Sequence, residues 1–265
     1  MYLKGLMQRM KKIEVRVLNP QVISDSDNMM VAMARLTQRG HSINTMHDLE
    51  CLLEKPYEPE TAENISKLPH PTLQKFGTIN IAVVGASRRF LAQITRHQNE
   101  VKFMSASLQY SNYTGAAQFV VPYESIEYDV THKNGISTVN YLNACENSLN
   151  AYEGLVRHIG KDAAGYAMPQ GLRNVLVIAA TPYQWKHMIR QRTCNRNTLE
   201  TQYVMAIIWE QLSSYSNTFT DCGPTCATGS CAEGNMSCGK PMKKCTAPSE
   251  LLDYKFSLLR EEYIS

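Results

Sequence analysis

The sequence predicts an α+β fold. Residues 13–18 (IEVRVL) alternate apolar and polar side chains, and residues 77–85 (GTINIAVVG) pass from such alternation into a continuous apolar run, so both segments favour β-strands. Residues 174–180 (NVLVIAA) form the most apolar of the expected strands. Helical patterns lie between and after these strands without regular alternation, which favours an α+β arrangement over a doubly wound parallel sheet.

Three helices are expected between the first two strands. Asp25 or Ser26 can act as the N-cap of the first helix, which Gly40 closes. The second helix is expected over residues 42–53, and after a Pro-rich break a short third helix is expected over residues 61–68.

The second strand leads into Ser87, which is expected to cap a helix that carries Arg96. From there to Gly115 the chain is expected to continue as an extended polar segment. Residues 127–140 are then expected to form a β-hairpin that turns at 133–135 (KNG).

The remaining expected elements are mainly helical. A long helix over residues 141–159 is followed by a helical turn that Pro169 ends. After the third strand, Thr181 is the expected N-cap, Pro182 takes the first helical position, and Gln184 completes a capping box. The last expected helices cover residues 182–192, 197–213 and 249–263, with an irregular tail from residue 218 before the final one.

The composition limits the kinds of partner. The chain has 265 residues with a formal net charge of +3, which is too mild to indicate nucleic-acid binding. No apolar run approaches the roughly 20 residues that span a bilayer. The N-terminus interleaves basic with apolar side chains and has no small-residue cleavage site, so a secretory signal is not expected. We therefore expect a cytoplasmic location.

Eight cysteines are unevenly distributed along the chain. A reducing compartment argues against a disulfide framework. The spacing in the tail lacks the C-x-x-C pairs of strong zinc signatures, so reduced or partly oxidised thiols are favoured, with zinc as the alternative. The tail cysteines are Cys222, Cys226, Cys231, Cys238 and Cys245.

The main functional candidate is the segment that begins with Arg96 and His97. A cationic pair followed by many short hydrogen-bonding side chains suits an anionic, heteroatom-rich ligand. The alternative is a helix end that complements the helix dipole, followed by an ordinary polar loop. The polar side chains that follow are Ser105, Ser107, Gln109, Tyr110, Ser111 and Asn112.

A second basic group consists of Arg190, Arg192 and Arg196. Arg192 and Arg196 share a helix face if the helix continues through them, and such a pair can hold a phosphate or polarise a carbonyl. A solvated face is the alternative, and Cys194 between them is expected to be packed rather than reactive. The sequence contains neither Ser-His-Asp spacing nor H-E-x-x-H, so nothing in it favours hydrolytic chemistry.

Four segments together resemble the flavin-dependent thymidylate synthases (ThyX). Residues 70–72 (HPT) look like the family's His-x-Ser/Thr-Pro segment, and residues 87–97 contain its S-R and Q-x-x-R-H positions. Residues 107–111 (SLQYS) are similar to the end of its RHRx7S signature. Residues 192–196 (RTCNR), with Glu200 after them, resemble its R-x-C-N-R-A-Q-W-E segment. The tail also resembles that of some members, so its cysteines need no metal to explain them.

Several arginines of the family pattern are replaced. The third residue of the signature is Gln98, and the arginine of its S-x-R-Y-S piece is Gln109. A phosphate-binding arginine is Gly165, the arginine of an Asn-x-Arg segment is Tyr183, and a later asparagine is His187. Losing one bidentate arginine–phosphate contact weakens binding by roughly 1.5–3 kcal/mol.

The resemblance covers about residues 13–240 and implies a single ThyX-like domain with a mixed or antiparallel sheet flanked by helices. We expect the catalytic domain to comprise residues 1–248, including the Cys-rich tail at 218–248, and residues 249–265 to form a C-terminal helix. The implied reaction is reductive methylation of dUMP, or a related pyrimidine nucleotide, with FAD, methylenetetrahydrofolate and NADPH. Because the family forms homotetramers with shared active sites, the same assembly is expected, with neither nucleic acid nor a membrane as partner.

The resemblance also implies roles for individual residues. Arg192 is the implied catalytic residue, placed against the uracil ring to polarise its N3–C=O edge. No metal ligand is implied. The implied substrate-binding residues are Gln93, Arg96, Ser105, Ser107, Leu108, Gln109 and Arg192. The implied flavin-binding residues are His70, Thr72, Arg96, His97, Gln98 and His187.

The replaced arginines leave two other functions open. One is a catalytically degenerate paralogue that keeps the fold and acts as a structural or regulatory partner, for example in a mixed tetramer. The other is an altered pyrimidine-nucleotide specificity such as hydroxymethylation, because Gln98 and Gln109 suit a less anionic ligand.

Overall fold

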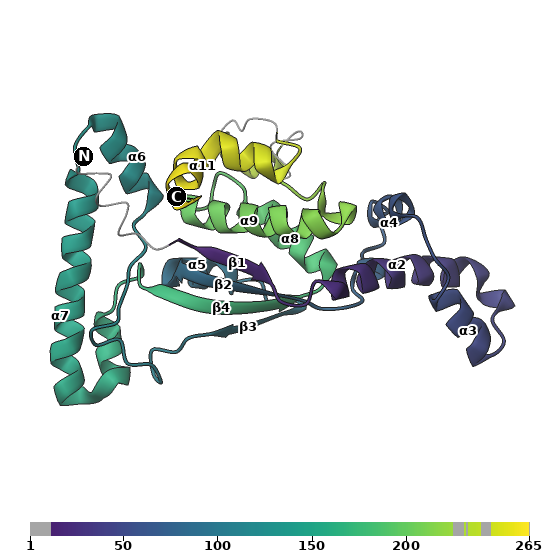
Figure 1. Ribbon diagram of the computed structural model, residues 1–265, viewed down its shortest axis with the longest axis horizontal. Helices are drawn as coiled ribbons and strands as arrows, with labels where there is room; N and C mark the ends of the chain where they lie inside the picture. Colours follow the sequence, from purple (N-terminus) through teal and green to yellow (C-terminus); the bar gives the residue numbers. More distant parts are fainter. Residues whose placement is uncertain (1–11, 225–230, 232, 240–244, 265) are drawn as a thin grey trace.

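A four-stranded antiparallel sheet forms the centre of the molecule (Figure 1). The computed structural model describes residues 12–224, 231, 233–239 and 245–264, the last seven as backbone alone. The predicted α+β class and the antiparallel sheet are confirmed. The strands, in the order in which they lie side by side, are β1 (Glu14–Val17), β2 (Ile79–Ser87), β4 (Arg173–Ala180) and β3 (Val101–Ser105).

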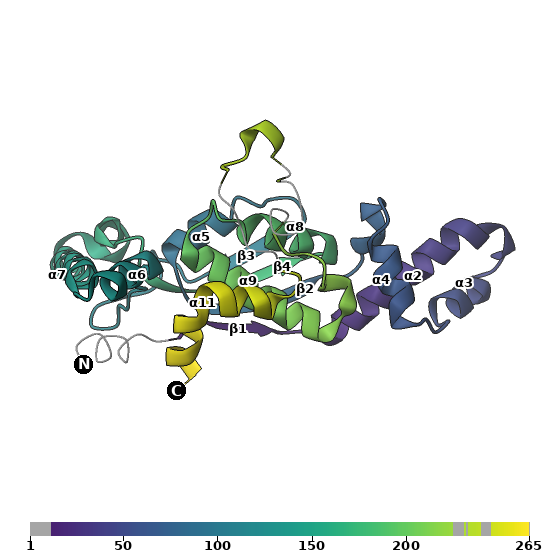
Figure 2. The same ribbon diagram turned by 90° about the horizontal axis from the view of Figure 1, so that it is seen from above.

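Helices cover one face of the sheet and extend beyond both of its ends (Figures 1 and 2). The helices over the covered face are α5 (Arg88–Ile94), α8 (Pro182–Arg192) and α9 (Leu199–Tyr215), with α11 (Pro248–Ile264) packed on α9. One end of the molecule is formed by α2 (Gln21–Arg39), α3 (Met46–Leu53) and α4 (Pro59–Ser66), and the other by α6 (Tyr123–His132) and α7 (Ile136–Ala164). Short 3-10 helices are η1 (Gly40–Ser42), η2 (Pro71–Gln74), η3 (Gly165–Ala167), η4 (Asn217–Phe219) and η5 (Gly234–Met236). No helix among the described residues is both long and apolar enough to cross a bilayer.

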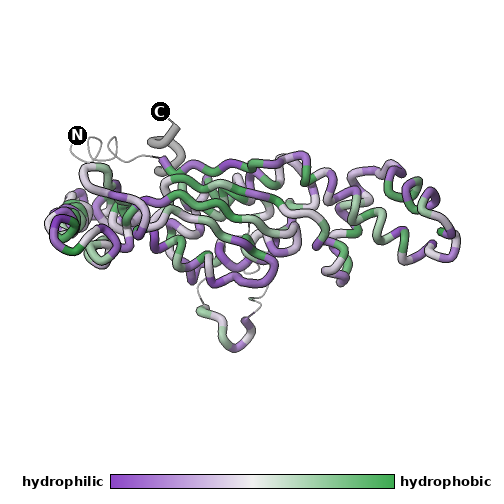
Figure 3. The backbone as a smooth tube through the Cα atoms, turned by 90° about the horizontal axis from the view of Figure 1, so that it is seen from below, coloured by the Kyte–Doolittle hydropathy of each residue, from purple (hydrophilic) through white to green (hydrophobic). Residues whose placement is uncertain are grey.

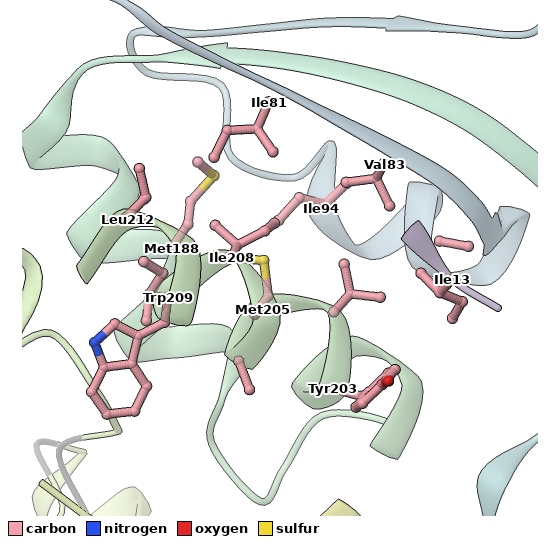
Figure 4. Packing of buried hydrophobic residues seen from close by; sticks show 14 of the residues in the cluster. Ile13, Ile81, Val83, Ile94, Met188, Tyr203, Met205, Ile208, Trp209 and Leu212 are labelled. Atoms are coloured by element: carbon pink, nitrogen blue, oxygen red, sulfur yellow. The ribbon is translucent and has the colours of Figure 1, made fainter. Parts of the chain in front are cut away.

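The core lies between the sheet and the covering helices (Figure 4). Along β2, Ile79, Ile81 and Val83 are fully buried, while the intervening side chains point to the other face. This alternation is the period-2 pattern that predicts a half-buried strand. The helices contribute residues such as Met205 and Trp209, and the same core continues into α11 through Leu251, Leu252 and Phe256.

The opposite face of the sheet is open and partly apolar (Figure 3). Val84 of β2 is 40% exposed, Val175 of β4 is 47% exposed, and Met104 of β3 is 75% exposed. No described helix covers these side chains. An apolar sheet face of this kind is a candidate contact surface for another molecule.

A β-bulge at Gly85 prepares the start of α5. The register of β2 against β4 shifts between Val84 and Ala86, and Gly85 takes a φ of +90° that favours glycine. A Cβ atom at this position would lie 2.0 Å from the guanidinium of Arg173. After the bulge both Ala86 and Ser87 are buried, so Ser87 enters the core side of the sheet.

Ser87 connects α5 to α9. Its Oγ accepts a hydrogen bond from the backbone N–H of Phe90 at 3.1 Å, as the predicted N-cap should. Its N–H and Oγ–H both donate to the carboxylate of Glu200, at 2.6 and 2.5 Å. Burial raises the pKa of Glu200, and the two bonds from Ser87 oppose this shift. The cap and the carboxylate therefore fix the two helix starts to each other.

Some expected elements differ from the structure. The predicted hairpin over residues 127–140 is wrong, because this stretch belongs to α6 and α7. Lys133, in the left-handed conformation, closes α6, and the buried carboxylate of Asp129 accepts bonds from the N–H groups of Ser137 and Thr138 at the start of α7. The turn was placed correctly, but it joins helices rather than strands.

Two further differences concern strand β3 and helix α2. The segment expected to be only extended and polar begins with β3, whose pairing with β4 adds a fourth strand to the sheet. Helix α2 begins at Gln21, after Pro20, so the predicted caps Asp25 and Ser26 lie inside the helix. Pro20 suits this place because its ring fixes a φ close to the helical value.

We expect Ser87→Ala to lower the free energy of unfolding by about 1–3 kcal/mol, because it removes the cap of α5 and one donor to a buried carboxylate. Urea denaturation measures the change. Ser24→Ala is the matched control: Ser24 is exposed on α2, and its loss should change the value by less than about 0.5 kcal/mol. Equal effects of the two variants would contradict the role assigned to Ser87.

Candidate functional site

Helix α8 carries one buried face and one polar face. Thr181 caps it by accepting a bond from the N–H of Gln184 at 3.3 Å, as predicted, and Pro182 takes the first position. Trp185, Met188 and Ile189 are fully buried against the sheet. This packing fixes the other face, where side chains at i, i+3, i+4 and i+7 spacing form a stripe. The stripe consists of Tyr183, Lys186, His187 and Arg190.

The central interaction of the site is between Arg192 and His97. Arg192 is the last residue of α8, which is labelled in Figure 1. The Nε–H of Arg192 donates to Nε2 of His97 at 2.8 Å. Because an arginine Nε can only donate, the Nε2 of His97 must carry a lone pair, and a neutral ring then has its proton on Nδ1. His187 stands edge-on to His97, with ring centroids 5.7 Å apart.

Asn197 holds the other side of the guanidinium. Its Oδ1 accepts a bond from Nη1 of Arg192 at 3.1 Å. Its Nδ2 donates to the backbone carbonyls of Gln191 and Cys194, at 2.8 and 3.1 Å, which satisfies acceptors at the C-terminus of α8. The Nη2 group of Arg192 makes no hydrogen bond to the described residues, so it remains available to a ligand.

The site has an excess of positive charge. Burial, reinforced by Arg192 and His187, lowers the pKa of His97 to about 4, so the imidazole is neutral at physiological pH. The pKa of Arg192 is also lowered, first by burial and then by the neighbouring charge of Arg96. Two guanidinium groups beside a neutral histidine form a site that an anionic group would stabilise.

A cavity of about 380 Å³ lies at this site. Its volume is within the range of about 300–1,000 Å³ that is typical of small-molecule sites. Tyr183 forms part of its wall and does not fill it. The lining residues are Arg96, His97, Gln98, Asn99, Tyr183, Gln184, His187, Gln191 and Arg192.

A family model described as "Thymidylate synthase complementing protein" (Thy1) matches residues 20–215. The chain belongs to this family. It is 24% identical over 180 residues to a flavin-dependent thymidylate synthase of Geobacter sulfurreducens, covering 67% of this chain and 75% of that protein. It is 26% identical over 189 residues to one of Clostridium tetani, covering 63% and 72%.

The fold is also similar to a solved structure. This is the UMP/dUMP methylase PolB from Streptomyces cacaoi bound with 5-Br dUMP. The two agree with a TM-score of 0.59 at 14% sequence identity, over 79% of this chain and 93% of that chain. At this level of identity the match supports the shared fold. The resemblance inferred from the sequence motifs is therefore confirmed at the level of the family.

The residues that the ThyX resemblance assigned to the nucleotide fall into two groups in the structure. Arg96 and Arg192 line the cavity described above, which we call the first cavity. The other group comprises Ser105, at the end of β3, and the following residues Ser107, Leu108 and Gln109. A Cβ atom on Gly165 would lie 3.4 Å from that of Leu108, so the replaced arginine position is next to this second group.

Three other assigned residues lie outside the lining of the first cavity. Gln93, in α5, accepts a bond from the hydroxyl of Thr201 at 2.7 Å, so it contacts the start of α9. Thr72 lies in η2 and His70 directly precedes it, and both residues are exposed. Helix η2 packs against α8.

The second basic group is corrected by the structure. Helix α8 ends at Arg192, and the Nδ2 group of Asn197 donates to the backbone carbonyl of Gln191 at this helix end. The helix does not continue, so Arg192 and Arg196 do not share a helix face. Arg196 donates to the backbone carbonyl of Met236 in the tail at 3.2 Å. Arg190 donates to the backbone carbonyl of Asp221 at 3.1 Å.

The described cysteines of the tail differ in exposure. Cys222 and Cys245 are buried, Cys231 is half-buried and Cys238 is exposed, while Cys226 lies outside the described residues. In the part of the chain that is described, no three His, Cys, Asp or Glu side chains are grouped so that they could hold a metal ion.

Sequence reasoning missed Asn197 as a residue of the site. It was assigned only to a helix start, and its contact with Arg192 depends on the turn after α8, which has no local sequence signal.

The low pKa of His97 predicts a pH dependence of stability. The unfolded chain takes up a proton at its ordinary pKa of about 6.5, whereas the folded ring stays neutral until about pH 4. The free energy of unfolding should therefore fall as the pH falls from about 6.5 to about 4. His97→Asn keeps a side-chain acceptor for Arg192 but does not titrate, so its stability should fall less over this range. Urea denaturation at several pH values measures both slopes, and identical slopes would show that His97 is not buried as a neutral ring.

Proposed function

We propose that this chain is a flavin-dependent enzyme that methylates dUMP or a closely related pyrimidine nucleotide. Membership of the thymidylate synthase complementing family supports the proposal, as do two relatives named flavin-dependent thymidylate synthase and a fold shared with a UMP/dUMP methylase. Methylenetetrahydrofolate would be the carbon donor. When bound, FAD supplies the hydride, and NADPH restores its reduced form.

The observation that carries the proposal is the way in which Arg192 is held. His97 and Asn197 fix two nitrogens of its guanidinium, at 2.8 and 3.1 Å, and leave Nη2 available. A preorganised cation of this kind stabilises negative charge as it develops on a ring carbonyl. Arg192 would therefore polarise the N3–C=O edge of the uracil ring, and Arg96 would add a second positive charge.

The residues of the first cavity fit a flavin ring. Amide side chains such as Gln98 and Gln191 can both donate and accept, which suits the alternating carbonyl and ring-nitrogen edge of an isoalloxazine. His97 and His187 would contact the ring as imidazoles with lowered pKa values. In this proposal His70 and Thr72 would complete the flavin site from η2 or from a neighbouring subunit.

The two nucleotide-binding groups support a site shared between subunits. Strand β3, residues Val101–Ser105, lies between Arg96 and the second group in the sequence and is about 13 Å long at about 3.3 Å per residue. Ser107 and Gln109 do not line the cavity that Arg96 lines. We propose a homotetramer in which Ser105, Ser107, Leu108 and Gln109 of one subunit, with Gln93 and Arg96 of another, bind the nucleotide.

The open face of the sheet supports such an assembly. Val84, Met104 and Val175 expose apolar side chains on a face that no described helix covers (Figure 3). Burying this surface between subunits would contribute the usual free energy of roughly 25 cal/mol per Å² of apolar area.

A catalytically degenerate paralogue is the second candidate. The second nucleotide-binding group motivates it, because Gln109 and Gly165 both replace arginines there. Lys161 is the nearby substitute: its ammonium donates to the backbone carbonyl of Tyr110 at 2.7 Å. Turnover by the purified chain alone distinguishes the two candidates.

We expect Arg192→Lys to lower the rate of tritium release from 5-tritiated dUMP by about 100-fold or more, because lysine lacks the planar guanidinium that His97 and Asn197 hold from two sides while Nη2 stays available. The assay contains FAD, methylenetetrahydrofolate and NADPH. Arg157→Lys, an exposed change on α7, is the control and should keep the wild-type rate. Wild-type protein that binds neither FAD nor dUMP in a calorimeter would contradict the proposal.

We expect Val175→Asp to break the assembly without unfolding the chain, because this side chain is already 47% exposed within one chain. The mass from light scattering should fall from that of four chains toward that of one or two. Met46→Asp, at a 70% exposed position on α3, should leave the mass unchanged. A wild-type protein that is monomeric at micromolar concentration would contradict the shared site.

A further inference from the structure

A hydrogen-bonded network joins the C-terminal helix α11 to Arg192. The ammonium of Lys255, on α11, donates to Oε1 of Gln202 in α9 and to Oδ1 of Asn195 in the turn after α8. The Nε2 group of Gln202 donates in turn to the backbone carbonyl of Asn197 at 2.8 Å. The side chain of Asn197 holds the guanidinium of Arg192 at 3.1 Å. A continuous set of contacts therefore runs from the end of the chain to the site.

The chemistry of the partners allows each amide in this network only one orientation. Oε1 of Gln202 faces an ammonium, which can only donate, and its Nε2 faces a carbonyl, which can only accept. In Asn197, Oδ1 likewise faces a guanidinium, and Nδ2 faces two backbone carbonyls. Turning either amide over would place donors against donors and acceptors against acceptors. The network therefore has a fixed direction, and it begins at Lys255.

Helix α11 is held firmly where Lys255 leaves it. Leu251 and Phe256 are fully buried in the core, and the ring of Phe256 lies 5.4 Å from that of Tyr203 in α9. The hydroxyl of Tyr123, at the start of α6, donates to the backbone carbonyl of Lys255 at 3.4 Å. The helix packs along α9 (Figure 1). The ammonium is therefore presented from a fixed backbone position.

Burial of Gln202 makes the lysine hard to replace by water. The residue is only 1% exposed, so a lost ammonium would leave Oε1 as an unpaired buried acceptor. The amide could escape this cost by turning over, but it would then lose its bond to the carbonyl of Asn197. In either case the turn that orients Arg192 would be less constrained.

The helix that supplies this contact lies outside the residues matched by the family model, which end at residue 215. We propose that Lys255 is a positioning residue, which fixes the turn after α8 through Gln202 and Asn195 and thereby orients the guanidinium of Arg192. The role of Arg192 in the reaction rests on the proposed function. The orientation of its guanidinium can be measured without turnover.

The test combines a spectroscopic and a kinetic measurement on the full chain. Lys255→Met keeps much of the side-chain length and removes the donors. Lys55→Met, at an exposed position between α3 and α4, is the matched control. Hydrogen exchange of the Arg192 Nε–H is followed in ¹H–¹⁵N correlation spectra at pH 7, with Arg192→Lys to assign the signal. Tritium release from 5-tritiated dUMP, with FAD, methylenetetrahydrofolate and NADPH, gives kcat and KM separately.

We expect Lys255→Met to speed the exchange of this proton by about tenfold or more, because the guanidinium is released more often from its two acceptors. The kcat should fall by about tenfold, while the KM for dUMP should change by less than about twofold, since the loss concerns orientation in the transition state. Lys55→Met should alter none of the three. Unchanged exchange in Lys255→Met would overturn the assignment, as would faster exchange with an unchanged kcat in an active enzyme.

A second variant tests the network without loosening α11. Gln202→Glu keeps an acceptor for the ammonium of Lys255 and removes only the donor to the carbonyl of Asn197. We expect the same rise in exchange and the same fall in kcat as in Lys255→Met. Wild-type behaviour of Gln202→Glu would show that Lys255 only attaches α11 to α9, and would overturn the positioning role.

The two measurements also separate this inference from the proposed function. A wild-type chain that releases no tritium, but whose Arg192 Nε–H exchanges faster in both variants, would overturn the function and support Lys255 as the residue that orients the guanidinium. A wild-type chain that releases tritium at a rate unaffected by either variant would support the function and overturn the inference.

Discussion

The hydrogen bond between Arg192 and His97 joins the end of α8 to the chain that follows α5, across 95 residues of sequence. It can form only while the imidazole is neutral, and burial together with the neighbouring cations keeps it so. Once the guanidinium is fixed by His97 and Asn197, it cannot turn away from Arg96 to reduce their repulsion. The resulting excess of positive charge, in a cavity rich in amides, is what makes an anionic heterocyclic ligand chemically suitable.

The fold supports this interaction through two helices that begin directly after strands. Ser87 ends β2 and caps α5, while Thr181 follows β4 and caps α8. Glu200 ties the cap of α5 to α9, and the buried face of α8 packs against the same sheet. Because both helices are fixed at their first turn, the positions of His97 and Arg192 follow from the sheet. The polar stripe of α8 then contributes Tyr183 and His187 to the wall of the first cavity.

The sequence determined some of these features locally and others only through contacts between distant residues. Strand β4, the Thr181 cap and the start of α8 could be predicted from the sequence, because the strand is continuously apolar and the cap is a local signal. The start of α7 could not be predicted, because it depends on the carboxylate of Asp129 in the preceding helix. The segment was therefore wrongly predicted to be a hairpin. The family motifs indicated that Arg96, His97 and Arg192 act together, but neither the role of Asn197 nor the separation of Ser107 from the first cavity has a signal in the local sequence.

The most direct test of the central claim is a long-range ¹H–¹⁵N correlation spectrum of the histidine rings at pH 7. Comparison with the spectra of His97→Asn and Arg192→Lys assigns the ring of His97 and reports its contact with Arg192. The arrangement described above predicts a neutral ring with its proton on Nδ1, and an Nε2 resonance that shifts in Arg192→Lys. A ring protonated on both nitrogens, or one with its proton on Nε2, would contradict it.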